Sequence, residues 1–221
     1  YEYDLPLSNS LTADEKNELN TVESRLTAAL DIKKAPKKEV TKAYNTFKAA
    51  NIRPSGNGFT GAPVVAPDEI DRKKGEMSWN NLEEMLAGFA YDAYYNHSEQ
   101  AKKNYFLVWD YAIDQGFAFG SGMGTNHHYG YQVRKIYTTA WLMRDAIWKA
   151  PNRDNILSAL IFWSALQETR IPFQYGRDEL LDSWHTLLMA KTVAALLFVD
   201  ERKRARALAG LSRWLSGSLQ Y

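Results

Sequence analysis

The residues best suited to chemistry lie in one glycine-rich stretch, GSGMGTNHHYGYQVRKIY, at residues 120–137. Two of the four histidines of the chain, His127 and His128, stand side by side there, after Asn126 and before Tyr129. An imidazole donates a hydrogen bond when neutral and carries a charge when protonated, and it changes between the two near neutral pH. The amide, imidazole and phenol groups together favour binding of an anionic ligand. The alternative is a turn whose histidines only bond the backbone.

Other chemistries fit this stretch less well. Adjacent residues rarely ligate one metal ion together, and the chain has no HExxH spacing. The GSGMG glycines lack the preceding strand and the third glycine of a dinucleotide-binding turn. The chain contains no cysteine, which excludes thiolate zinc sites, cysteine nucleophiles and disulfides. We therefore expect no metal site and no cofactor in this segment.

Two further stretches rich in Gly and Pro add cationic, amide and aromatic side chains. Aromatic planes can stack on sugar rings, and the guanidinium fork of arginine binds carboxylates and sulfates. Carboxylates are few in these stretches, although Glu168, Asp178 and Asp182 leave a glycosidase pair open, and Asp178 is also a natural helix cap. The combined set suits an anionic sugar polymer, and it comprises Arg53, Asn57, Phe59, Asn126, His127, His128, Tyr129, Tyr131, Arg170, Phe173, Tyr175, Arg177, Trp184 and His185.

The elements that position these residues are predicted to be helices, because almost no segment alternates apolar and polar residues as a strand does. Ser78 and Ser98 are expected to cap two of them, and Gly116 to end the second. A proline is tolerated in a first turn, so Pro151 is expected to begin another. The predicted helices are 11–30, 37–50, 78–96, 98–116, 129–149, 151–167, 178–199 and 200–217.

Short and long connections alternate between these helices. The long ones are 51–77, 117–128 and 168–177, and in an up-down array every second connection emerges at the same end. The three polar stretches should therefore share one face. We predict one all-α domain over residues 1–221, built of helical hairpins in an incomplete (α/α) toroid. A helical hairpin at residues 1–50 precedes a long loop at residues 51–77, and residues 78–221 form three more hairpins.

The composition excludes several classes of function. The chain has 221 residues and a formal net charge of +1, so no global polycation is available for nucleic acid. The basic run at 202–206 is expected to be a solvated helix face. No apolar run is long enough for a membrane span, so we expect no membrane contact. The start at Tyr1, without Met, predicts a piece of a longer polypeptide.

Two stretches resemble a known family: GMGTNHHYGYQVRKIYTTAWLM and QETRIPFQYGRDELLDSWHTLLMA, with the helices around them. They are similar to the helical domain of the hyaluronate and chondroitin polysaccharide lyases, above all to the branch of chondroitin sulfate ABC lyases. The resemblance runs from about Glu76 to the end of the chain. It implies β-elimination at uronic acids of chondroitin or dermatan sulfate, with hyaluronan as a further substrate, and a secreted or periplasmic enzyme.

The resemblance also implies roles for particular residues. Other branches carry an Asn followed by paired tryptophans at the matching turn, so Asn126, His127 and His128 should contact substrate with altered chemistry. The Asn that neutralises the uronate on the next loop has no counterpart in QYGRD, which leaves Arg177 and His128 as candidates. With the residues expected from the polar stretches themselves, and with Arg134 expected to brace the site, the predicted substrate-binding set is Asn126, His127, His128, Tyr129, Arg134, Tyr175, Arg177 and Trp184.

No catalytic residue is expected within this segment, because the family's central His, Tyr and Arg would follow Tyr221 in the remaining domains of the polypeptide. The chain alone should then have little or no lyase activity. Two alternatives stay open: a glycoside hydrolase of the α/α-toroid type, and a non-catalytic helical carbohydrate-binding module.

Overall fold

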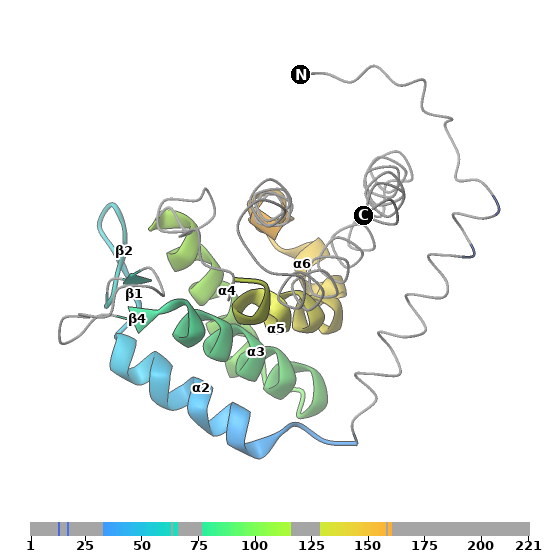
Figure 1. Cartoon of the computed structure of the whole chain (residues 1–221). Coiled ribbons are helices and arrows are strands. Elements are labelled where there is room, and N and C mark those ends of the chain that lie inside the picture. Colours follow the sequence, from blue (N-terminus) through green and yellow to red (C-terminus); the bar gives the residue numbers. More distant parts are fainter. Residues whose placement is uncertain are drawn as a thin grey trace, which may run out of the picture.

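The structure, a computed structural model, describes residues 33–62, 64–65, 77–115, 129–157 and 159–160, together with Ala13 and Asn17. Its helices and strands are shown in Figure 1. Helices make up most of these residues, so the predicted all-α class is confirmed; closure into a toroid and the division into hairpins stay predictions. The helices are α2 (Lys37–Ala50), α3 (Trp79–Tyr95), α4 (Glu99–Asp114), α5 (Tyr129–Leu142) and α6 (Arg144–Lys149).

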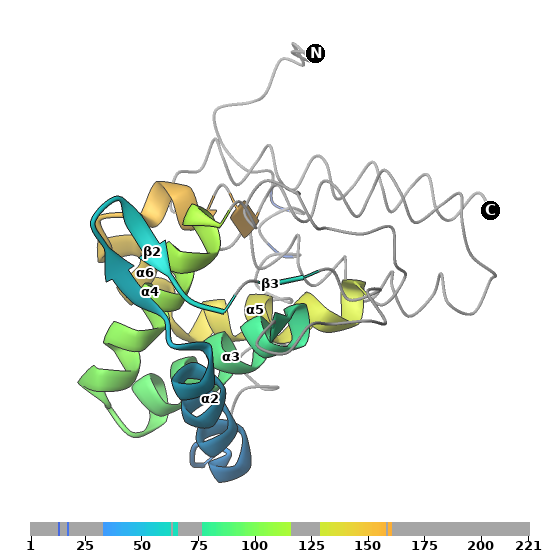
Figure 2. The same ribbon diagram turned by 90° about the vertical axis from the view of Figure 1, so that its left-hand side faces the viewer.

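Helix α3 is the centre of the described fold. It packs against α2, α4 and α5, and Figures 1 and 2 show it between them. A helix that is apolar on most sides has to be covered on most sides. The fully buried side chains of α3 include Leu82, Met85, Leu86, Phe89 and Ala90. The run SWNNLEEMLAGFAYDAYY therefore explains why one helix organises the other three.

Helices α2 and α3 approach each other closely at Gly88. A Cβ atom on Gly88 would lie 2.4 Å from the Cβ of Ala43 and 2.7 Å from the carbonyl oxygen of Glu39. Beside this contact, the ring of Phe89 meets Tyr44 and Phe47 edge-on, with centroid separations of 5.1 and 5.4 Å. The small residues Gly88 and Ala43 thus let the two helices come close enough for these aromatic rings to pack beside the contact.

Helix α4 begins as predicted. The hydroxyl of Ser98 accepts a hydrogen bond from the Ala101 N–H at 3.1 Å, which satisfies one of the free donors of the first turn. The helix ends at Asp114, within two residues of the predicted Gly116. Its fully buried side chains fill the core on the side of α3 away from α2 and comprise Ala101, Tyr105, Val108, Trp109, Tyr111 and Ala112.

The predicted loop at 51–77 contains four short strands. β1 (Arg53–Ser55) and β2 (Gly58–Thr60) form an antiparallel hairpin, and β3 (Val64–Val65) pairs in parallel with β4 (Met77–Ser78). Asn51, with φ 52°, ends α2 in the left-handed region. The strands were missed because pairs this short are held by backbone bonds and need no apolar alternation.

The predicted helix 129–149 is interrupted at Met143. The guanidinium of Arg144 donates to the Trp141 carbonyl at 2.9 Å and lies 4.3 Å above the Trp141 ring, which stabilises the end of α5. The following helix includes residues 153–157 rather than starting at Pro151, because residues 151 and 152 form a turn. In that turn Asn152 donates to the Asp110 carboxylate of α4, which fixes the turn on the core.

Candidate functional site

The predicted substrate-binding residues fall largely outside the described part of the chain. Tyr129 and Arg134 belong to helix α5, whose backbone is described. The others, Asn126, His127, His128, Tyr175, Arg177 and Trp184, lie outside the described residues. Their roles stay predictions, and the described structure bears on the elements next to them.

The β1–β2 hairpin is attached to the C-terminal end of α4. The N–H of Phe59 donates to the carboxylate of Asp114 at 3.1 Å, and Tyr111 donates its hydroxyl to the Ala62 carbonyl at 2.5 Å. Both views of the ribbon place the hairpin beside α4 (Figures 1 and 2). Since α4 ends at Asp114, the first predicted loop stands where the connection toward Asn126 leaves the helix. The connection 117–128 lies outside the described residues, so the shared end of the polar connections stays a prediction.

Glycine at position 58 is required by this attachment. Its φ is +138°, and a Cβ atom there would lie 2.6 Å from one oxygen of the Asp114 carboxylate. Residues other than glycine rarely adopt that backbone conformation. The sequence SGNGF therefore encodes a turn that brings a peptide N–H directly onto a carboxylate.

The polar residues of the hairpin are exposed, and its aromatic residue is half-buried. Arg53 and Asn57 are exposed, as the prediction of a cationic and amide face requires. Phe59 is half-buried and packs against the hydrophobic core. Its role as an aromatic platform is thereby reduced, because the ring helps to anchor the hairpin.

Replacing Asp114 by Ala is expected to release the hairpin without unfolding the helices. The lost bond is exposed, so its contribution is about 1 kcal/mol, and the Phe59 amide should exchange its hydrogen about fivefold faster. Amide exchange followed by NMR measures this directly. The matched control is Asp154→Ala, which removes an exposed carboxylate paired with Arg153 at 3.3 Å and should leave the Phe59 amide unchanged. Unchanged exchange in Asp114→Ala would contradict the attachment.

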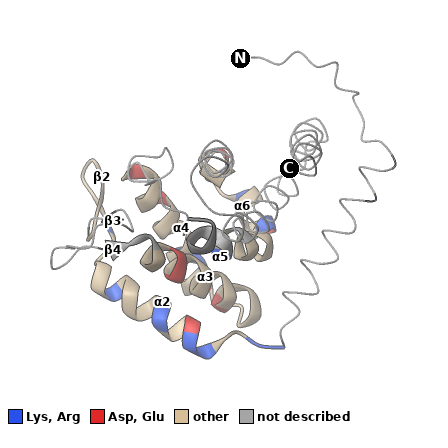
Figure 3. Ribbon diagram, in the orientation of Figure 1, with Lys and Arg blue, Asp and Glu red and all other residues tan. Residues whose placement is uncertain are grey.

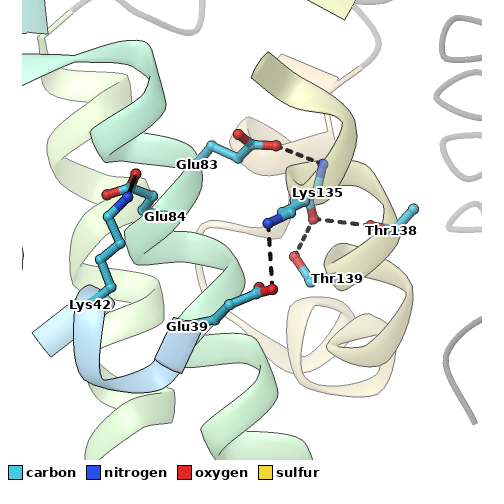
Figure 4. Close-up of polar contacts among 7 residues, drawn as sticks. All are labelled: Glu39, Lys42, Glu83, Glu84, Lys135, Thr138 and Thr139. Atoms are coloured by element: carbon cyan, nitrogen blue, oxygen red, sulfur yellow. Dashed lines mark hydrogen bonds and ion pairs between the residues drawn. The ribbon is translucent and has the colours of Figure 1, made fainter. Parts of the chain in front are cut away.

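Helix α5, which carries Tyr129 and Arg134, is fixed by polar contacts to α2 and α3 (Figure 4). The Glu83 carboxylate of α3 accepts a hydrogen bond from the Lys135 N–H at 3.0 Å. The Lys135 ammonium lies 3.5 Å from the Glu39 carboxylate of α2. On the other flank of α3, Glu84 pairs with Lys42. Two neighbouring glutamates on α3 thus face different helices.

The two glutamates differ in electrostatics as well as in direction. Burial raises the pKa of Glu83 to about 7, against the lowering effects of the Lys135 N–H and the Lys135 charge; Glu84 and Glu39 raise it further. A carboxyl group with a pKa near neutrality inside a protein is often functional, although structural networks produce the same shift. Glu83 is therefore an ionisable group beside α5 whose pKa is shifted close to neutral pH.

Charges on the described elements are mixed in sign. Basic and acidic residues lie close together along α2 (Figure 3). Among the described residues, no group of three His, Asp or Glu side chains could hold a metal ion. None of the described helices is long and apolar enough to cross a membrane. The described surface thus offers local cationic groups, such as Arg53, rather than one basic face.

Neither Asp114 nor Glu83 belongs to a sequence motif that marks it as functional. Asp114 is followed by Gln115 and Gly116, and this signal was used only for the end of the helix. Glu83 belongs to the pair Glu83–Glu84 in the first turns of a helix, where acidic residues are common. The sequence signal that could have identified Glu83 is a carboxylate on a helix that is otherwise apolar on most sides.

Comparisons with known proteins agree in pointing to lyases. A family model described as "Lyase, catalytic" matches residues 5–221. The chondroitin sulfate ABC exolyase of Bacteroides thetaiotaomicron is 29% identical over 130 residues, 55% of this chain and 12% of that protein. The chondroitin sulfate ABC endolyase of Proteus vulgaris is 31% identical over 121 residues, 54% of this chain and 12% of that protein.

The chondroitin sulfate ABC exolyase of Proteus vulgaris is 26% identical over 125 residues. The matched part spans only 12% of the length of each of these three relatives. The resemblance predicted from the sequence is nevertheless confirmed, since the family model covers nearly the whole chain. The chain belongs to the family of lyase catalytic domains.

Proposed function

We propose that this chain forms part of a glycosaminoglycan lyase and supplies one wall of its substrate-binding cleft. The observation that carries the proposal is the family match over residues 5–221, together with relatives that are chondroitin sulfate ABC lyases. The proposed substrates are chondroitin and dermatan sulfate, with hyaluronan as a further one. A secreted or periplasmic location, further domains of the same polypeptide and an α/α-toroid architecture belong to the proposal.

The proposed reaction is β-elimination at a uronic acid. A base removes the proton on the carbon alpha to the carboxylate, an acid protonates the departing 4-linked oxygen, and a double bond forms between the two carbons. Groups that neutralise the carboxylate stabilise the enolate-like intermediate. The proposal assigns Asn126, His127 and His128 to substrate contact, with His128 or Arg177 on the carboxylate, and it assigns no base to this chain.

Two features of the described structure support this role. The hairpin with exposed Arg53 is attached to the end of α4, so a cationic group of the first polar connection lies where α4 ends and the sequence continues toward Asn126. In addition, His127 and His128 directly precede α5, and the free N–H groups and dipole of a helix N-terminus favour an anion. Both features suit a polymer with carboxylates and sulfates.

The first test is to incubate the chain with chondroitin sulfate and follow three signals. The proposal predicts saturable binding that weakens with salt, and little ultraviolet absorbance from unsaturated uronate. Strong absorbance would show that the chain carries its own base and would overturn the assignment of roles. New reducing ends without absorbance would indicate a hydrolase instead. No binding would contradict the proposed cleft wall.

The second test is substitution of the histidine pair. His128→Ala should weaken chondroitin sulfate binding about tenfold, equivalent to about 1.4 kcal/mol. It should also lower turnover about tenfold in a lyase that contains this segment. Titration calorimetry measures the affinity, and circular dichroism checks that the fold is kept.

The matched control is His97→Asn, because His97 is an exposed histidine at the opposite end of α4 from Asp114. Its φ of 54° is left-handed, and asparagine tolerates that conformation. The control should bind as the parent chain does. Equal affinity of the parent chain, His127→Ala and His128→Ala would mean that the pair is structural.

A further inference from the structure

All three polar groups of Lys135 are engaged (Figure 4). Its N–H donates to Glu83 at 3.0 Å, and its ammonium lies 3.5 Å from Glu39. Its carbonyl accepts hydrogen bonds from the hydroxyls of Thr138 at 3.3 Å and Thr139 at 2.5 Å. The contacts to Glu39 and Glu83 come from α2 and α3, so one residue of α5 is tied to both helices.

The bond from the Lys135 N–H differs from an ordinary contact between helix side chains. In a helix, the N–H normally bonds the carbonyl four residues earlier, and a side chain that enters this ladder marks a point where the helix can bend. Lys135 lies near the middle of α5 (Tyr129–Leu142), and the next turn carries the buried residues Ile136, Thr139 and Ala140. The Glu83 contact therefore lies between these buried residues and the turns at 129–134.

We propose that Glu83 is a positioning residue: acting through the Lys135 N–H, its carboxyl group holds the N-terminal turns of α5 against the α2–α3 pair. This inference rests on the proposed function, which assigns residues at the start of α5 to substrate binding. Glu83 itself contacts no substrate in this role. Its effect is to keep the first turns of α5 in one position, so that binding does not require ordering them.

The ionisation of Glu83 supports this role, because it predicts that the contact to Lys135 depends on pH. The charged and titratable groups around it are Glu39 and Lys42 from α2, Glu84 and Tyr91 from α3, and Lys135 from α5. Burial raises the pKa of Tyr91 to about 12, so Tyr91 stays neutral. Burial likewise raises the pKa of Glu83 to about 7, above its ordinary value of 4.5. Glu83 should therefore change charge near neutral pH.

The sign of the pH effect follows from linkage. Because the packed state binds the proton of Glu83 more tightly than the open state, its contribution is fully present below about 4.5 and is lost as the pH rises through about 7. Between about pH 4.5 and pH 7 the open form should gain about tenfold per pH unit, and above pH 7 the gain levels off because Glu83 is then ionised in both forms. Glu83→Gln imitates the protonated acid and should keep the contact throughout.

The experiment compares the parent chain with Glu83→Gln and Glu83→Ala by amide exchange at about pH 6 and about pH 8, corrected for intrinsic rates. In the parent chain, protection of the Lys135 amide should fall about tenfold between the two pH values, relative to that of Leu86 in the core. Glu83→Gln should show no such fall, and Glu83→Ala should be poorly protected at both. Glu84→Gln is the matched control, since Glu84 pairs with Lys42 rather than α5. It should keep the pH-dependent fall, moved toward lower pH because the Glu84 charge helps to raise the pKa of Glu83.

A second measurement links this position to binding. Glu83→Ala should weaken chondroitin sulfate binding about fivefold, and Glu83→Gln should restore it. Equal protection of Lys135 in the parent chain and Glu83→Ala would overturn the inference, and so would altered protection with unchanged affinity. If Glu83→Ala does not fold, the pH comparison between the parent chain and Glu83→Gln decides. If the parent chain does not bind chondroitin sulfate, the proposed function fails, and the exchange result still decides the role of Glu83.

Discussion

Gly88→Ala is expected to lower the free energy of unfolding by about 2–3 kcal/mol. The added methyl group would lie 2.4 Å from the Ala43 Cβ and 2.7 Å from the Glu39 carbonyl oxygen. The second neighbour is backbone, so α2 and α3 would have to move apart. The better helix propensity of alanine, about 1 kcal/mol, offsets only part of this loss. Denaturant unfolding measures the change.

Two comparisons make this prediction specific. Gly56→Ala adds a methyl group that meets no atom within 4 Å, so it should change stability little. In the double variant Gly88→Ala with Ala43→Gly, the shorter of the two contacts disappears, and part of the lost stability should return. A stable Gly88→Ala chain would show that α2 does not lie so close to α3.

Trp109→Ala is expected to lower the free energy of unfolding by about 3–5 kcal/mol, the usual range for an indole deleted from a core. Trp109 is fully buried on α4, and its ring lies 6.5 Å from that of Tyr105. The cavity would open between α4 and its neighbours in the core. The expected result is a lower denaturant midpoint, with weaker attachment of the hairpin that α4 supports.

Trp148→Ala is the matched control. Its ring is half-buried and is covered on one face by the Arg153 guanidinium at 5.2 Å. Its removal should cost about 1–2 kcal/mol, because less apolar surface returns to water. If Trp109→Ala lost no more stability than Trp148→Ala, α4 would not be the core helix described above.

Helix bounds and caps that depend on neighbouring residues are predicted correctly from the sequence. The bounds of α2 are the predicted residues 37–50, and the Ser98 cap is present at the start of α4. Both depend on short-range chemistry: helical periodicity in the first case and an oxygen facing free N–H groups in the second. The interruption at Met143 was not predicted, because it depends on a contact of Arg144 with the Trp141 carbonyl and ring.

The contacts that matter most for the candidate site are long-range. Phe59 reaches Asp114 across 55 positions, and Lys135 reaches Glu83 across 52. No spacing rule links such residues in a single sequence. The alternation of short and long connections predicts that the elaborated connections share an end, and that inference depends only on the up-down order of the helices. The histidine pair itself stays a prediction.

The central claim is that residues 126–134 contact an anionic sugar polymer. The most direct measurement is amide exchange of the chain with and without a chondroitin sulfate oligosaccharide. The account predicts added protection at 126–134 that disappears when His127 and His128 are both replaced by Ala. Protection confined to the C-terminal end of α3, where Tyr94 is 45% exposed beside Tyr95, would contradict it. So would protection at 126–134 that persists in the double variant.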